Sequence, residues 1–143
     1  SYPEHTWYEL SRLKKFDKHL NIDNGFKPIN GQLKNSRIVI ICYDSTLILE
    51  AFSTNYPFII FLPDGINHLK DNVKIDYEML IRSELLFTNY LDLKEKIEEV
   101  YLDTISWWDS MKVQEARSVW INKYTKISNN KVSDLRNLIE KKL

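Results

Sequence analysis

The chain has 143 residues, of which 43% are hydrophobic and 28% are charged, a balance that favours one folded domain over a disordered chain. Lysine plus arginine and aspartate plus glutamate each number 20, so the formal net charge is zero and the basic surface typical of nucleic-acid-binding proteins is not indicated. No apolar run approaches the roughly 20 residues of a transmembrane helix.

The first part of the chain predicts short elements separated by a turn. A helix is expected from Trp7 to about His19, because apolar residues recur there at helical spacing. The stretch Leu20–Ile22 precedes the turn signal Asp23-Asn24-Gly25 and is interpreted as a brief strand. A short helix is expected between Pro28 and Asn35.

The next stretch predicts a strand, a helix and a second strand. Arg37–Cys42 reads RIVIIC, a continuous apolar run typical of a strand buried on both faces of a parallel sheet. Tyr43-Asp44-Ser45 breaks that run, and Thr46–Ser53 has the apolar spacing of a helix. Phe58–Leu62 is a second fully apolar run. The crossover between the two strands should be right-handed.

The rest of the chain alternates helices with one more strand. A helical segment is expected to begin within Asn67–Asn72, and the pattern predicts a helix over Ile75–Ser83, a strand over Leu85–Phe87, and helices over Tyr90–Leu102 and Met111–Tyr124. The residues expected to face the core are Tyr77, Leu80, Ile81, Leu93, Ile97, Val100, Val113, Ala116, Val119 and Trp120. The residues expected to face water are Lys94, Glu95, Lys96, Glu98 and Glu99.

These elements predict the α/β class, as an open Rossmann-like parallel sheet of about four strands in three layers, with helices on both faces. We expect residues 1–126 to form this partial domain and residues 127–143 to form an amphipathic C-terminal helix packed on it. Four strands are fewer than the roughly six of a complete doubly wound nucleotide-binding domain. The chain is therefore interpreted as part of something larger.

The single cysteine, Cys42, lies at the end of the first predicted buried strand. A small buried apolar side chain is the favoured interpretation, ahead of a reactive nucleophile. One cysteine cannot build a disulfide framework, which is typical of a protein in the reducing cytoplasm.

Polar residues follow the first of these strands at its carboxyl end, where open α/β sheets bind their ligands. Asp44, Ser45 and Thr46 lie between this strand and a helix, and a helix N-terminus offers free amides to a phosphate. Glu50 lies one turn further on and could accept hydrogen bonds from a ribose. Ordinary helix capping by Asp44 or Ser45, with Glu50 in solvent, is the alternative interpretation.

The run Tyr43–Ala51 resembles the [Ser/Thr]-x-x-x-Glu-Ala segment in the C-terminal domain of GT-B glycosyltransferases. The wider chain, from Tyr2 to about Tyr124, resembles transferases of bacterial surface-carbohydrate biosynthesis loci. The stretches that support the wider likeness are Tyr2-Pro3 with Trp7, Asp23-Asn24-Gly25-x-Lys27-Pro28, Ser36-Arg37, Asn55-Tyr56-Pro57, Leu69-Lys70-Asp71, Trp107-Trp108-Asp109-Ser110 and Val113-Gln114-Glu115-Ala116-Arg117.

This resemblance implies the donor-binding domain of a glycosyltransferase in surface-polysaccharide biosynthesis. Its ligand would be a nucleotide-sugar donor, with Ser45 and Thr46 on the phosphate and Glu50 on the ribose. An N-terminal GT-B domain or a partner chain would supply acceptor contacts and the catalytic base. The resemblance implies transfer without an essential metal or cofactor, in which Lys70 helps to neutralise the leaving group. Asp44 and Lys70 depart from the family pattern, where an uncharged residue and an arginine are usual.

Two further points stay open. His68 follows the second predicted strand, where it could meet a phosphate or a sugar, or could simply cap a helix at the surface. A non-catalytic α/β interaction or regulatory domain is the alternative function, favoured by Asp44 and by the missing half of the enzyme. A response-regulator-like domain is disfavoured, because no pair of acidic residues ends the first strand.

Overall fold

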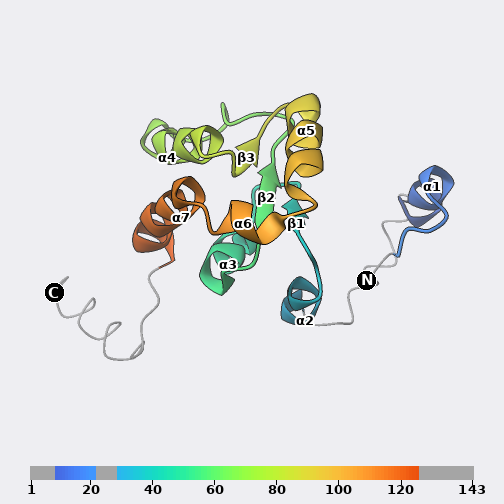
Figure 1. Ribbon diagram of the computed structural model, residues 1–143. Helices are drawn as coiled ribbons and strands as arrows, with labels where there is room; N and C mark the ends of the chain where they lie inside the picture. Colours follow the sequence, from blue (N-terminus) through green and yellow to red (C-terminus); the bar gives the residue numbers. More distant parts are fainter. Residues whose placement is uncertain (1–8, 22–28, 126–143) are drawn as a thin grey trace, which may run out of the picture. The chain divides into compact units, whose positions relative to one another are not determined.

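The computed structural model describes residues 9–21 and 29–125, and Figure 1 shows it as a ribbon. The chain divides into two compact units, Ser1–Ser36 and Arg37–Leu143. The first unit contains helices α1 (Glu9–Phe16) and α2 (Ile29–Lys34). The helix predicted for residues 127–143 lies outside the described residues.

The prediction of a brief strand over Leu20–Ile22 is wrong for Leu20 and Asn21, the two of these residues that the structure describes. The amide of Leu20 donates to the carbonyl of Asp17 at 3.3 Å, and the Asp17 carboxylate accepts from the amide of His19 at 2.8 Å. These bonds form a turn directly after α1, so Leu20 and Asn21 are not extended in a sheet.

The second unit contains a parallel sheet of three strands: β1 (Val39–Ile41), β2 (Phe58–Phe61) and β3 (Leu86–Phe87). Their spatial order is β1-β2-β3. The α/β class and the parallel pairing are confirmed, whereas the expected number of about four strands is wrong for the part of the chain that the structure describes.

The central strand β2 is buried and β1 is partly open. Ile59 and Ile60 on β2 are 0% exposed, but Ile40, which pairs with Ile59, is 41% exposed. Among residues 9–21 and 29–125, β1 pairs with β2 alone, so it forms a sheet edge. The prediction that Arg37–Cys42 is buried on both faces is therefore wrong, and Cys42 is exposed rather than buried.

In the described part of this unit, one helix follows β1, one follows β2 and three follow β3. They are α3 (Thr46–Thr54), α4 (Asp71–Arg82), α5 (Tyr90–Val100), α6 (Thr104–Trp108) and α7 (Met111–Tyr124). The two helical segments predicted around Asn67 and Ile75 are one helix, α4, and α6 was not predicted. Helix α7 packs against α3, α4 and α6, and Figure 1 shows it beside α4 to the left of the sheet.

Local signals explain where these helices begin and end. Asn55 follows α3 in the left-handed conformation with φ 58°, and Asn89 caps α5 by accepting from the amide of Leu91 at 2.7 Å. Asp103 accepts from the amide of Ser106 at 3.2 Å and so begins α6. Helix α3 begins at the predicted Thr46 and ends one residue beyond the predicted Ser53.

Aromatic side chains join the helices to β2 in the core. Phe52 on α3 lies 4.8 Å from Phe58 and 5.1 Å from Trp120, measured between ring centroids, and Phe58 lies 5.2 Å from Trp108. The indole N–H of Trp108 donates to the Asn55 side chain at 3.0 Å, which ties α6 to the end of α3. Trp108 is 2% exposed and therefore belongs to the core.

Three of the predicted orientations are wrong. Ile81 is 37% exposed and Val119 is 50% exposed, because each lies about 100° around its helix from a neighbour, Leu80 or Trp120, that takes the core position. Lys96, expected in water, is only 7% exposed, because it meets carboxylates from two elements. No helix in the described ranges is long and apolar enough to cross a bilayer.

Candidate functional site

The carboxyl ends of β1 and β2 meet at one edge of the sheet, because the two strands are parallel. A hollow of about 590 Å³ lies there, which we call the carboxyl-edge hollow. Its lining residues are Cys42, Tyr43, Asp44, Leu62, Pro63, Asp64, Gly65, Asn67 and His68. Gly65 has φ 72°, a conformation that side chains with a Cβ rarely adopt, and so permits the tight turn after β2.

A second hollow, of about 220 Å³, lies at the N-terminus of α3, and we call it the helix-start hollow. Its lining residues are Asp44, Ser45, Thr46, Ile48, Leu49, Val73, Tyr77, Trp120 and Tyr124. Asp44 lines both hollows, so one carboxylate stands between them.

Two buried polar atoms of the helix-start hollow have no hydrogen-bond partner among the described residues. They are the hydroxyl of Ser45 and the indole nitrogen of Trp120, a side chain that is 2% exposed. Ser45 is the N-cap of α3, but its side chain makes no capping bond. Buried polar groups are nearly always paired, and an unpaired one costs about 1–3 kcal/mol. Together with the free amides of α3, these donors favour a polar or anionic ligand.

The Asp44 carboxylate is held from two sides. The hydroxyl of Tyr77 donates to Oδ1 of Asp44 at 2.7 Å, and Nε2 of His68 lies 3.8 Å from Oδ2. Burial and the hydrogen bond to Asp44 raise the pKa of the Tyr77 hydroxyl, so this phenol stays protonated and keeps donating. The Asp44 carboxylate, a hydrogen-bond acceptor oriented by Tyr77, therefore lies between the carboxyl-edge and helix-start hollows.

The structure brings some of the predicted site residues together and separates others. Asp44, Ser45 and Thr46 line the helix-start hollow, and Asp44 and His68 line the carboxyl-edge hollow. Glu50 is exposed on α3, away from the buried face of that helix, and lines neither hollow. Lys70 is exposed before α4 and also lines neither.

Sequence reasoning placed Tyr77 and Trp120 only in the core. Both line the helix-start hollow from helices that follow β2 and β3, and the hydroxyl of Tyr77 reaches Asp44 there. The available signal was chemical: a buried tyrosine or tryptophan usually finds a partner for its O–H or N–H. In the part of the chain that the structure describes, no three His, Cys, Asp or Glu residues are grouped to hold a metal ion.

A family model described as LIC12162 family transferase matches residues 1–139 of the chain. No curated protein and no solved structure matches it.

Proposed function

We propose that this chain, which belongs to the LIC12162 family of transferases, is the part of a glycosyltransferase that binds a nucleotide-sugar donor. The family supplies the reaction class, the transfer of a group between molecules. One observation carries the finer assignment: the Ser45 hydroxyl and the Trp120 indole N–H are buried, without partners among the described residues, in side chains that line the hollow at the start of α3.

The donor phosphates would occupy the helix-start hollow. The first amides of α3, the hydroxyls of Ser45 and Thr46, and the indole N–H of Trp120 would donate hydrogen bonds to phosphate oxygens. The same donors would stabilise the negative charge that develops on the leaving phosphate. Glu50, one turn along α3, would accept from the ribose only if the ribose extends out of the hollow along that helix.

The sugar would occupy the carboxyl-edge hollow on the other side of Asp44. Asp44 and Asp64 can accept hydrogen bonds from sugar hydroxyls, and Asn67 can both donate and accept. A phosphate directly against Asp44 would be repelled, whereas a hydroxyl would not. The arrangement of one carboxylate between two hollows therefore favours phosphate on the α3 side and sugar on the His68 side.

A second domain or a partner chain would complete the enzyme, in the manner of a GT-B fold. It would bind the acceptor substrate and supply the catalytic base. The described residues of this corner are assigned only to the nucleotide-sugar. A role in surface-polysaccharide biosynthesis and a cytoplasmic location belong to the same proposal, on the strength of the sequence resemblance and the single cysteine.

Titration calorimetry with CMP, UDP and GDP tests this function. For whichever nucleotide binds, we expect Ser45→Ala to lower the affinity roughly tenfold. The reason is that a hydrogen bond to a charged group contributes about 1.5–3 kcal/mol. Since Ser45 makes no capping bond, the variant should unfold at the wild-type temperature or slightly above it. The matched control is Ser53→Ala, in the last turn of the same helix, where the hydroxyl donates to the carbonyl of Glu50 at 2.7 Å.

Two results would oppose the proposal. One is the absence of binding by all three nucleotides. The other is a loss of affinity in Ser45→Ala no greater than in Ser53→Ala. Either result would favour the non-catalytic interaction domain, for which the acidic side chain of Asp44 at this corner is the supporting observation.

A further inference from the structure

A third hollow, of about 480 Å³, lies near the amino end of β3, whereas the proposed donor site lies beyond the carboxyl ends of the strands. It is lined by Glu84, which precedes β3, and by residues of α5, α6 and the start of α7. Its volume is in the range of about 300–1,000 Å³ that small-molecule sites occupy. We call it the amino-edge hollow.

Glu84 is fixed at this edge by two lysines. Its Oε2 accepts from Nζ of Lys96 at 2.6 Å, and its Oε1 accepts from Nζ of Lys112 at 2.6 Å. The backbone of Glu84 has φ 61°, a left-handed conformation that is unfavourable for a residue with a Cβ. Glu84 follows the C-cap of α4, where its amide donates to the carbonyl of Ile81 and the amide of Leu85 donates to the carbonyl of Leu80, each at 3.0 Å, a helix-ending motif that requires a left-handed residue.

The charges around the amino-edge hollow nearly cancel. Lys96 is 7% exposed and also donates to both oxygens of Glu99 at 3.0 Å, so its hydrogens are committed to carboxylates. Counting Asp103, two lysines face three carboxylates along the lining. The described lining therefore has one more negative than positive group, which disfavours an anion, and the carboxylates retain lone pairs that can accept from a ligand.

The hollow also holds a buried donor and an apolar surface. The indole nitrogen of Trp107 is buried and has no hydrogen-bond partner within residues 9–21 and 29–125. Val100 and Val113, both buried, line the hollow beside the Trp107 ring. A ligand for this place needs an apolar face, a hydrogen-bond acceptor for the indole and donors for Glu84 and Glu99.

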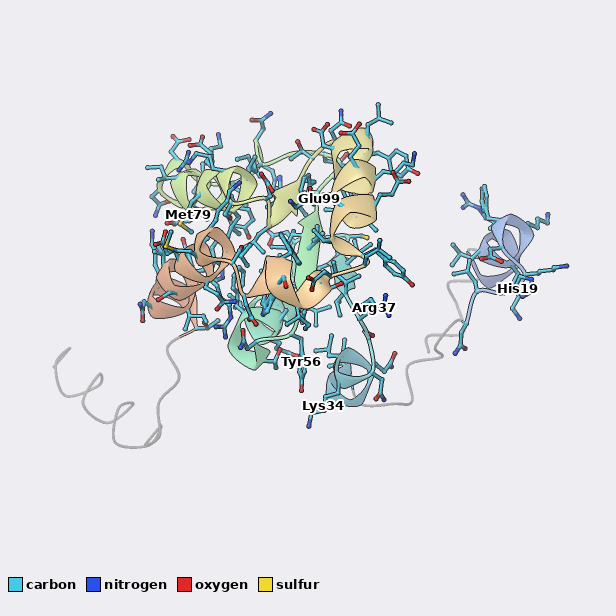
Figure 2. The ribbon with its side chains drawn as sticks, in the orientation of Figure 1. His19, Lys34, Arg37, Tyr56, Met79 and Glu99 are labelled. Atoms are coloured by element: carbon cyan, nitrogen blue, oxygen red, sulfur yellow. The ribbon has the colours of Figure 1, made fainter. Side chains whose placement is uncertain are left out.

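We propose that the amino-edge hollow binds an uncharged saccharide, at a site separate from the donor site. A pyranose ring has an apolar C–H face that can lie on an indole, and its hydroxyls both donate and accept. The Trp107 N–H would donate to one hydroxyl, and Glu99 on α5, labelled in Figure 2, would accept from another. This saccharide site does not depend on nucleotide binding at α3.

Nuclear magnetic resonance of the tryptophan indole protons in the full chain tests the saccharide site. The probes are D-glucose, D-galactose, N-acetyl-D-glucosamine and maltose, with inorganic phosphate as the charged comparison. We expect a sugar to shift one indole signal, assigned to Trp107 by its loss in Trp107→Phe. Glu99→Gln should lower the affinity for that sugar roughly tenfold, because a charged hydrogen-bond acceptor is exchanged for a neutral one.

The controls separate this site from the rest of the molecule. Glu95→Gln changes the same charge on the same helix at an exposed position and should leave the sugar affinity unchanged. Ser45→Ala should also leave it unchanged, whatever it does to nucleotides. Three outcomes would overturn the saccharide site: no shift of the Trp107 signal with any sugar, a shift with phosphate alone, or equal sugar affinity in Glu99→Gln and Glu95→Gln.

Discussion

The hydroxyl of Tyr77 on α4 donates a hydrogen bond to the carboxylate of Asp44, 2.7 Å away in the turn that follows β1. Tyr77 is 6% exposed but Asp44 is exposed, so this bond is partly buried. It connects the helix between β2 and β3 to the corner beyond β1 and holds Asp44 between the carboxyl-edge and helix-start hollows. The same pair of side chains therefore bears on stability and on the proposed ligand site.

Tyr77→Phe should lower the free energy of unfolding by about 1.5 kcal/mol, the low end of the range for bonds to charged groups, because the hydrogen bond that it removes is only partly buried. Urea unfolding at neutral pH measures the change. Tyr90→Phe is the control, since Tyr90 is 65% exposed at the start of α5. An equal, small effect of both substitutions would show that the bond to Asp44 contributes little.

Tyr77→Phe should also change how the free energy of unfolding depends on pH above about pH 10. Burial and Asp44 raise the pKa of Tyr77 above its ordinary value of 10.0, so on passing pH 10 the unfolded chain loses this proton while the folded chain keeps it. The folded state then binds more protons, and stability falls as the pH rises. The contribution is complete below pH 10. Tyr77→Phe should make this fall shallower, and Tyr124, whose pKa burial and Asp76 also raise, should account for a remaining part.

Glu84 offers a comparison of two substitutions at one left-handed position. Glu84→Ala and Glu84→Gly lose the same bonds to Lys96 and Lys112, but only glycine relieves the unfavourable φ of 61°. We expect both variants to be less stable than the wild type. The free energy of unfolding of Glu84→Gly should be roughly 1 kcal/mol higher than that of Glu84→Ala. Thermal or urea unfolding of the pair measures this difference.

The order should reverse at Glu95, which is exposed within α5. There Glu95→Gly should be less stable than Glu95→Ala by roughly 1 kcal/mol, since glycine is the poorer residue in a helix interior. Finding alanine better than glycine at both positions would contradict the left-handed strain assigned to Glu84.

Ile40 and Ile59 are paired across β1 and β2 and should respond very differently to truncation. Ile59 is 0% exposed, so Ile59→Ala should cost about 2–5 kcal/mol through lost transfer energy and a cavity. Ile40 is 41% exposed, and Ile40→Ala should cost less than roughly 1 kcal/mol. Chemical denaturation measures both, and comparable losses would mean that the outer edge of β1 is covered.

These two isoleucines also mark how far the sequence could predict the fold. Both lie in short apolar runs, and such runs identify strands correctly because the signal is local. Whether a strand is central or at an edge depends on which strands pair with it, and no local pattern records this. Lys96 is similar, because its burial follows from Glu84, a residue that reaches it from the turn before β3.

The candidate site was predictable to the same extent. The sequence placed Asp44, Ser45 and Thr46 at this corner, because the end of a strand followed by the start of a helix is visible in it. Tyr77 and Trp120 were assigned to the core alone, because their polar atoms reach the helix-start hollow only after α4 and α7 have packed. Helical spacing predicts that such side chains point inward, but not which corner their O–H or N–H meets.

Asp44→Asn tests how a ligand lies across the two hollows. The amide oxygen can still accept from Tyr77, while the negative charge beside the helix-start hollow is removed. If phosphate binds there, free CMP, UDP or GDP should bind roughly fivefold more tightly, because a unit charge about 4 Å away contributes about 1 kcal/mol even in water. A nucleotide-sugar should gain less, because its sugar hydroxyls lose a charged acceptor.

Calorimetric titration of the wild type and Asp44→Asn with each nucleotide and its sugar conjugate measures that difference. Asp92→Asn, exposed in the first turn of α5, controls for the change in overall charge. Weaker or unchanged binding of the free nucleotides would mean that no phosphate lies near Asp44. A larger gain for the conjugate than for the free nucleotide would mean that the sugar is not on the His68 side of the carboxylate.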